Sequence, residues 1–146
     1  MHFRSIGVSN FGMHHLVELQ KLSNVPPSVN QIEVHPYLQE KDLVRYCKEN
    51  NIAVQAYSPL ANGRKLDDKL LVRLGTKYAR SPAAMLIKWC LAQDFVRIPK
   101  SSNASRIEEN LTASEFELRA DDMDILDSLD ENFRTCHEKI KLPWTG

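Results

Sequence analysis

The residues best suited to binding chemistry follow a short apolar run in the second half of the chain. Lys100 and Ser101 end that run, and a helical segment is expected to begin two residues later. Within it, Arg106, Glu109 and Asn110 are spaced i, i+3 and i+4 and therefore share one helix face. A cation and a hydroxyl beside the free N–H groups of a helix N-terminus suit a phosphate. The alternative reading is a solvated helix face with ordinary charged residues.

The elements that position these residues alternate along the chain. Apolar runs predict strands at residues 6–8, 29–34, 53–57 and 95–98, and helical periodicity predicts helices around Leu16 to Leu22 and at 40–49, 67–78, 82–92, 103–111 and 121–129. Strand and helix in alternation indicate parallel strands joined by right-handed crossovers. Val54 and Val96 lie in apolar runs typical of strands covered on both faces. No GxGxxG motif follows the first strand, which argues against a dinucleotide fold of the Rossmann type.

Polar residues stand at the carboxyl end of every predicted strand. They are Ser9 and Asn10, Gln31, Tyr57 and Ser58, and Lys100 and Ser101. In a (β/α) barrel this end of the strands is the ligand-binding face. The sequence therefore predicts one site assembled from four strand ends.

Composition limits the classes of function. Of the 146 residues, 42% are hydrophobic and 26% charged, and 19 basic residues balance 19 acidic ones, so no nucleic-acid footprint is expected. No apolar run reaches the length of a membrane span, and the N-terminus does not resemble a signal peptide, so we expect a cytoplasmic protein. Cys47, Cys90 and Cys136 form no CxxC pair and are expected to be free thiols, and no metal site is expected. Asp121 and Asp122 are expected on a solvated helix face.

The four strand ends together resemble the aldo-keto reductase family. The resemblance rests on Ile6–Phe11, Asn30–Glu33, Ala56–Leu60 and Ile98–Ser101, with Arg106, Glu109 and Asn110 behind the last block, and covers about residues 4–135. It implies the C-terminal half, strands five to eight with their helices, of a TIM-type (β/α)8 barrel. The whole chain, residues 1–146, would form one partial reductase domain, with an irregular tail at 136–146.

The resemblance also implies a cofactor, NADPH, and a role for each matching residue. Ser9, Asn10 and Gln31 would hydrogen-bond the nicotinamide carboxamide, and Tyr57 would stack on the nicotinamide ring. Ser58 and Leu60 would contact the pyrophosphate. Lys100, Ser101 and Arg106 would hold the adenosine 2′-phosphate, and Glu109 and Asn110 would contact the adenine. His35 would be a structural histidine.

The same resemblance implies that catalytic residues are missing from this chain. In the family, a tyrosine donates the proton with help from a lysine, an aspartate and a histidine, and all four belong to the first four βα units. We therefore expect the cofactor-binding half of an enzyme that reduces an aldehyde or ketone. The alternatives are a non-catalytic NADPH-binding or regulatory module, and an inactive fragment. Because two edge strands would stay open, we expect the chain to dimerise, to aggregate or to require an N-terminal half-barrel.

Overall fold

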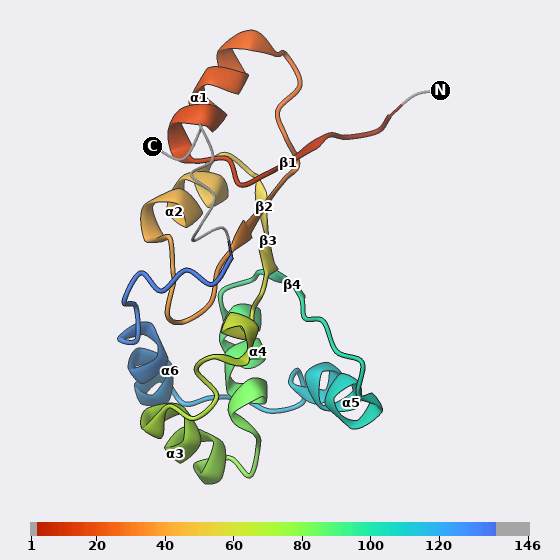
Figure 1. Ribbon diagram of the computed structural model, residues 1–146. Helices are drawn as coiled ribbons and strands as arrows, with labels where there is room; N and C mark the ends of the chain where they lie inside the picture. Colours follow the sequence, from red (N-terminus) through yellow and green to blue (C-terminus); the bar gives the residue numbers. More distant parts are fainter. Residues whose placement is uncertain (1–2, 137–146) are drawn as a thin grey trace.

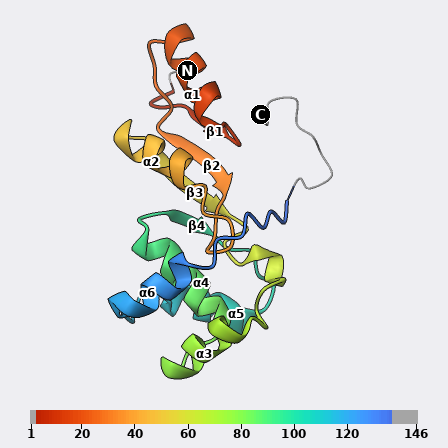
Figure 2. The same cartoon turned by 90° about the vertical axis from the view of Figure 1, so that its left-hand side faces the viewer.

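Four parallel strands form the centre of the molecule. The computed structural model describes residues 3–136 and contains the strands β1 (Gly7–Ser9), β2 (Val29–Glu33), β3 (Ala53–Tyr57) and β4 (Val96–Ile98). They form one sheet in chain order, and Figure 2 shows them stacked from β1 to β4. All three strand pairs are parallel, so each connection crosses over through helical segments. The predicted alternation and the parallel sheet are confirmed.

The helices occupy the segments between and after the strands. They are α1 (Met13–Leu22), α2 (Lys41–Glu49), α3 (Lys69–Lys77), α4 (Pro82–Ala92), α5 (Ala104–Thr112) and α6 (Ala120–Asp127), with a short 3-10 turn, η1 (Ala61–Gly63). In Figure 1, α1 lies beyond β1 at one end of the sheet, and α3, α5 and α6 surround α4 at the other. None of the helices between residues 3 and 136 is both long and apolar enough to cross a membrane.

Side-chain caps explain where three of these helices begin. The Asp68 carboxylate accepts a hydrogen bond from the Leu70 amide at 2.8 Å, and the Ser81 hydroxyl accepts one from the Ala84 amide at 3.1 Å. The Asn103 side chain does the same for the Arg106 amide at 3.2 Å. Each cap satisfies a backbone donor that has no partner within its own helix. These caps fix the starts of α3, α4 and α5 close to their predicted positions.

The two faces of the sheet differ in burial. Ile32, Val54 and Ala56 are buried on the face that packs against the helices. On the other face, Val96 lies beside Gln55 and Ile98 beside Tyr57 in the strand register. Val96 is 51% exposed and Ile98 40% exposed. The expectation that Val96 belongs to a strand covered on both faces is therefore wrong, because no helix or strand among residues 3–136 covers this second face at β4.

Two further expectations are corrected by packing. Leu22, predicted on the apolar stripe of its helix, is 78% exposed, whereas Leu16 is fully buried. Asp122, predicted on a solvated face, is only 3% exposed. Its two carboxylate oxygens accept hydrogen bonds from the Lys77 ammonium at 2.9 and 2.7 Å, and the Tyr78 hydroxyl also donates to it. These bonds, first from Lys77 and then from Tyr78, lower the pKa of Asp122 and join α3 to α6.

The predicted irregular tail, residues 136–146, lies outside the described residues except for Cys136. Cys136 is partly exposed, while Cys47 and Cys90 are buried, and all three are free thiols. Burial raises the pKa of Cys90 to about 12, so this thiol stays protonated.

Candidate functional site

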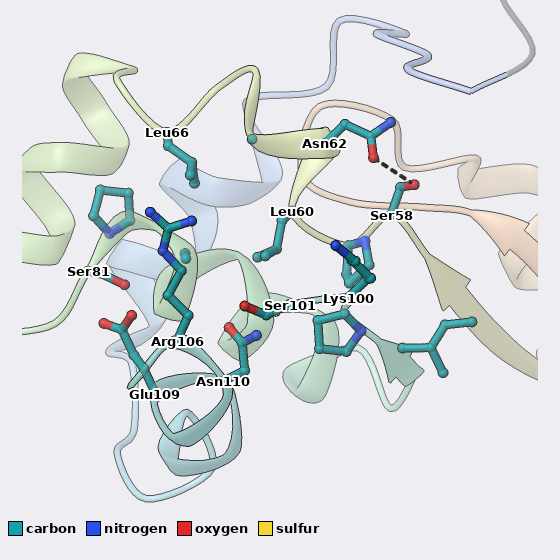
Figure 3. Close-up of a pocket in the computed structure, with 16 residues that line it drawn as sticks. Ser58, Leu60, Asn62, Leu66, Ser81, Lys100, Ser101, Arg106, Glu109 and Asn110 are labelled. Carbon is teal, nitrogen blue, oxygen red and sulfur yellow. Dashed lines mark hydrogen bonds between the residues drawn. The ribbon is translucent and has the colours of Figure 1, made fainter. Parts of the chain in front are cut away.

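A pocket of about 540 Å³ opens at the carboxyl ends of β3 and β4. Its walls come from the segment after β3, the start of α4, the segment after β4 and one face of α5 (Figure 3). The lining residues are Ser58, Pro59, Leu60, Asn62, Gly63, Leu66, Ser81, Pro82, Ala83, Ile98, Pro99, Lys100, Ser101, Arg106, Glu109 and Asn110. Seven of the eleven residues predicted to bind the cofactor therefore line one pocket: Ser58, Leu60, Lys100, Ser101, Arg106, Glu109 and Asn110.

The wall formed by α5 is positioned by a short turn after β4. The Ser101 hydroxyl accepts a hydrogen bond from the Asn103 amide at 3.2 Å, and Asn103 in turn caps α5. Figure 3 shows the Arg106 side chain projecting from α5 towards Leu66 and the Glu109 side chain projecting towards Ser81. Asn110, the residue deepest in this wall, is 8% exposed. The i, i+3, i+4 spacing therefore places all three polar groups on the pocket side, as predicted.

The electrostatics of the pocket favour an anion. Lys100 and Arg106 are exposed cations, while Glu109 is the one acidic residue in the described lining. The N-terminus of α4, at Ser81 and Pro82, forms part of the opposite wall. Helix N-termini carry free N–H groups and a partial positive charge. Two cations and the start of α4 therefore converge on one cavity.

The segment after β3 has an unusual backbone. Ser58, Ala61 and Asn62 have φ angles of 47°, 48° and 51°, all in the left-handed region. Non-glycine residues in this region cost of order 1 kcal/mol each and persist only where surrounding contacts hold them. One such contact is within the segment, where the Ser58 hydroxyl donates to the side-chain carbonyl oxygen of Asn62 at 3.3 Å (Figure 3). This strained segment forms the wall nearest to β3.

The other four predicted residues form a second group beside the pocket. The Ser9 hydroxyl donates to the Gln31 backbone carbonyl at 3.0 Å, and the Asn10 amide donates to the same oxygen at 2.9 Å. The Tyr57 hydroxyl donates to the Asn10 side-chain carbonyl at 3.0 Å. These residues do not line the pocket, but Tyr57 precedes Ser58, which does. Together the two groups make a continuous polar edge from β1 to α5.

The tyrosine in this group is not tuned to release a proton. Burial, and next the negative charge of Glu33, raise the pKa of Tyr57 to about 12. Its hydroxyl is therefore protonated near neutral pH and acts as the donor to Asn10. In this arrangement the ring supplies a flat surface at the carboxyl end of β3.

Sequence reasoning missed several pocket residues. Asn62 and Leu66 belong to the segment after β3, and Ser81 begins α4. Ser81 is recognisable from sequence as a helix cap, but nothing in its local pattern indicates that this helix start faces the α5 wall. For Asn62, the following glycine signals a turn without indicating its direction.

No cluster suited to a metal ion occurs among residues 3–136: they contain no group of three or more His, Cys, Asp or Glu residues in position to hold one. His35 is fully buried, with its Nε2 atom 3.4 Å from a Glu33 carboxylate oxygen.

Comparison with known proteins identifies relatives of this chain. Residues 2–131 match the profile described as the aldo/keto reductase family. Glyoxal reductase of Bacillus subtilis is 44% identical over 131 residues, which are 90% of this chain and 48% of the relative. Aldose reductase B of Dictyostelium discoideum is 42% identical over 135 residues, 91% of this chain and 43% of the relative. The chain thus spans about half the length of the curated relatives it matches.

Solved structures agree in fold as well as in sequence. The apo form of Gox0644 superposes with a TM-score of 0.86 at 39% identity, over 90% of this chain and 49% of that one. The silkworm aldo-keto reductase AKR2E5 complexed with NADPH gives a TM-score of 0.84 at 36% identity, over 90% of this chain and 44% of that one. On the sequence profile, the sequence identities and the superposed α/β fold, this chain belongs to the aldo/keto reductase family.

Proposed function

We propose that this chain supplies the NADPH-binding half of a reductase that converts an aldehyde or ketone to an alcohol. The observation that carries the proposal is the pocket between β4, α4 and α5, in which Lys100, Ser101 and Arg106 lie opposite the N-terminus of α4. This donor set fits a phosphate monoester, the group that distinguishes NADPH from NADH. Arginine and lysine together with backbone N–H groups are the usual partners of such a group.

The remaining residues form two regions that bind different parts of the cofactor. Glu109 and Asn110 contact the adenine, and Ser58 and Leu60 contact the pyrophosphate. Ser9, Asn10 and Gln31 bind the carboxamide and thereby select the face of the nicotinamide ring, while Tyr57 stacks on that ring. The bound cofactor supplies the hydride. The residues of this chain bind it, orient its ring and exclude water from one side.

The proton donor of the reaction is proposed to lie outside this chain. A tyrosine with this role needs a pKa lowered towards neutrality. In Tyr57 and Tyr37 the pKa is instead raised, mainly by burial. The hydroxyl groups of Tyr46 and Tyr78 are bound to Gln20 and Asp122 and do not line the pocket.

We also propose that residues 1–146 form one partial domain equivalent to strands five to eight of an eight-stranded barrel. The open edges β1 and β4 support this reading, as do the exposed side chains of Val96 and Ile98 on the uncovered sheet face. Apolar residues are exposed on the helices at both edges as well: Met13 and Leu22 in α1, and Ile107 and Leu111 in α5. A second copy or an N-terminal half-barrel would cover these surfaces.

The same observations favour a second candidate, an NADPH-binding module without catalytic activity. Titration of the full chain with NADPH, followed by addition of an aldehyde, separates the two functions. Binding without loss of the reduced nicotinamide absorbance supports the module. Turnover by the purified chain would contradict the proposed absence of a proton donor. Failure of the wild-type chain to bind NADPH, measured together with its oligomeric state in sedimentation, would refute both functions if the chain is folded.

A further inference from the structure

The segment after α6, residues 130–136, crosses from that helix to the carboxyl ends of the strands, and we call it the strap. The Phe133 amide donates to the Tyr37 carbonyl at 2.8 Å, and Arg134 forms an ion pair with Glu40. These contacts hold the middle of the strap against the turn that follows β2.

The end of the strap is anchored by a buried carboxylate. Glu33, the last residue of β2, is fully buried and accepts hydrogen bonds from the Thr135 amide at 2.7 Å and the Cys136 amide at 2.9 Å. The Thr135 hydroxyl also donates to Glu33. Burial by itself raises the pKa of this carboxyl, but hydrogen bonds from His35, Thr135 and Cys136 outweigh it and lower the pKa to about 2. The carboxylate is therefore ionised at any physiological pH, and the anchor is permanently charged.

The anchored threonine in turn contacts the strained wall of the pocket. We call residues 58–66 the pocket loop. The Asn62 side-chain amide donates to the Thr135 hydroxyl oxygen at 3.0 Å, and the Ser58 hydroxyl lies 3.2 Å from the Cys136 sulfur. Thr135 thus accepts from Asn62 while it donates to Glu33. Hydrogen bonds in such a chain polarise one another, so the charge of Glu33 strengthens the bond to Asn62.

External contacts hold the pocket loop in place, among them this bond and the ion pair between Lys65 and Glu131 of the strap. Three of its residues have left-handed backbone angles, and its internal hydrogen bonds are short-range: the Ala61 amide to the Ser58 carbonyl, the Gly63 amide to the Leu60 carbonyl and the Arg64 amide to the Ala61 carbonyl. Bonds between neighbours do not fix the position of a loop relative to the rest of the protein. The contact with Thr135 joins it to β2 through residues far apart in sequence.

We infer that Thr135 is a positioning residue, which holds the pocket loop in the shape that receives the pyrophosphate of the cofactor. This inference takes the identity of the ligand from the proposed function. The role of Thr135 in holding the loop is argued from the loop geometry alone. Among the described residues, no hydrogen bond or ion pair joins residues 100–110 to the strap, and this wall keeps its own caps. Loss of the Thr135 hydroxyl therefore affects one side of the pocket and spares the other.

The test compares Thr135→Val, which removes the hydroxyl and keeps the branched shape, with Thr135→Ser, which restores it. Thr76→Val is the matched control, because the Thr76 hydroxyl donates to the Val72 carbonyl within α3, outside the pocket. The first measurement is amide hydrogen exchange at Ala61, Gly63 and Arg64 in the ligand-free full chain. We expect exchange about fivefold faster in Thr135→Val, the equivalent of one neutral hydrogen bond, and wild-type rates in Thr135→Ser and Thr76→Val.

The second measurement uses NADPH and adenosine 2′-monophosphate, which lacks the pyrophosphate. Thr135→Val is expected to raise the dissociation constant for NADPH about fivefold and to leave that for the monophosphate unchanged. In an Asn62→Gly background, which suits the positive φ angle, Thr135→Val is expected to have no further effect.

The outcomes separate the inference from the proposed function. Unchanged exchange in Thr135→Val, or no rescue by Thr135→Ser, overturns the positioning role. Equal weakening of both ligands also overturns it, because the effect would then be general. If wild-type protein binds neither ligand, the proposed function fails, and the exchange rates still decide whether Thr135 positions the loop.

Discussion

Replacement of Arg106 by alanine tests the identity of the pocket most directly. The side chain is exposed on the pocket face of α5, and only its backbone amide contributes to the helix cap, through the 3.2 Å bond to Asn103. Alanine keeps that amide and favours the helix, so the fold is expected to be unaffected. What is lost is a charge-assisted contact with the 2′-phosphate, about 2 kcal/mol, or roughly 30-fold in the dissociation constant for NADPH.

The assay compares NADPH with NADH, which lacks that phosphate. In fluorescence titration of the full chain, Arg106→Ala is expected to change the dissociation constant for NADH by less than about threefold, because the uncharged 2′-hydroxyl of NADH gives Arg106 no anionic partner. Arg73→Ala, an exposed arginine of α3 outside the pocket, is the matched control and should affect neither cofactor. Because Arg106 is exposed, the selective loss should shrink as salt is raised. Equal weakening of NADPH and NADH in Arg106→Ala would refute the placement of the phosphate.

Three other perturbations test the fold and the second group of residues. The pKa of Glu33 is lowered from 4.5 to about 2, so its ionised form stabilises the fold fully above pH 4.5. The free energy of unfolding should therefore fall by about 3 kcal/mol as the pH is lowered towards 2. In denaturant unfolding, Glu33→Gln should abolish this part of the pH dependence. Gly75→Ala should lower the unfolding free energy by about 1–3 kcal/mol, because the added Cβ would lie 2.7 Å from the Arg80 carbonyl, whereas the exposed neighbour substitution Thr76→Ala should cost less than about 0.5 kcal/mol in the same melts. Tyr57→Phe loses the hydroxyl and its bond to Asn10 but keeps the ring, and it should weaken NADPH binding less than Tyr57→Ala, which also loses about 1 kcal/mol of stacking; equal effects in titration would contradict a stacking role.

The fold was predictable because its signals are local. Strand and helix alternate with short apolar runs and clear caps, and Ser81-Pro82 and Asn103 mark helix starts within a residue of their observed positions. Exposure was less predictable. Val96 has the composition of a fully covered strand, yet its exposure depends on what lies beyond the edge of the sheet, which no local pattern reports.

The pocket was predictable only where it follows a strand. Carboxyl ends of neighbouring parallel strands share one edge, so Ser58 and Lys100 could be brought together from topology alone. Asn62 and Leu66 enter through a left-handed loop conformation, and such a conformation in non-glycine residues is not visible in sequence. Contacts at long range were missed for a similar reason: Glu33 and Thr135 are 102 residues apart, and Lys77 and Asp122 are 45 apart. Periodicity places a residue on a face but does not identify its partner.

The two regions of the proposed site differ in how much they depend on closure of the sheet. The phosphate region is walled on both sides by elements of this chain, α4 and α5, whereas Ser9, Gln31 and Tyr57 lie along the edge of the open sheet face. We therefore expect adenosine 2′-monophosphate to bind with the same affinity at low and high protein concentration. NADPH affinity should rise where self-association covers the open face, since only then is the nicotinamide shielded from water. Titration of both ligands across the association range measured by sedimentation checks this, and a monophosphate affinity that follows NADPH would contradict the division of the site.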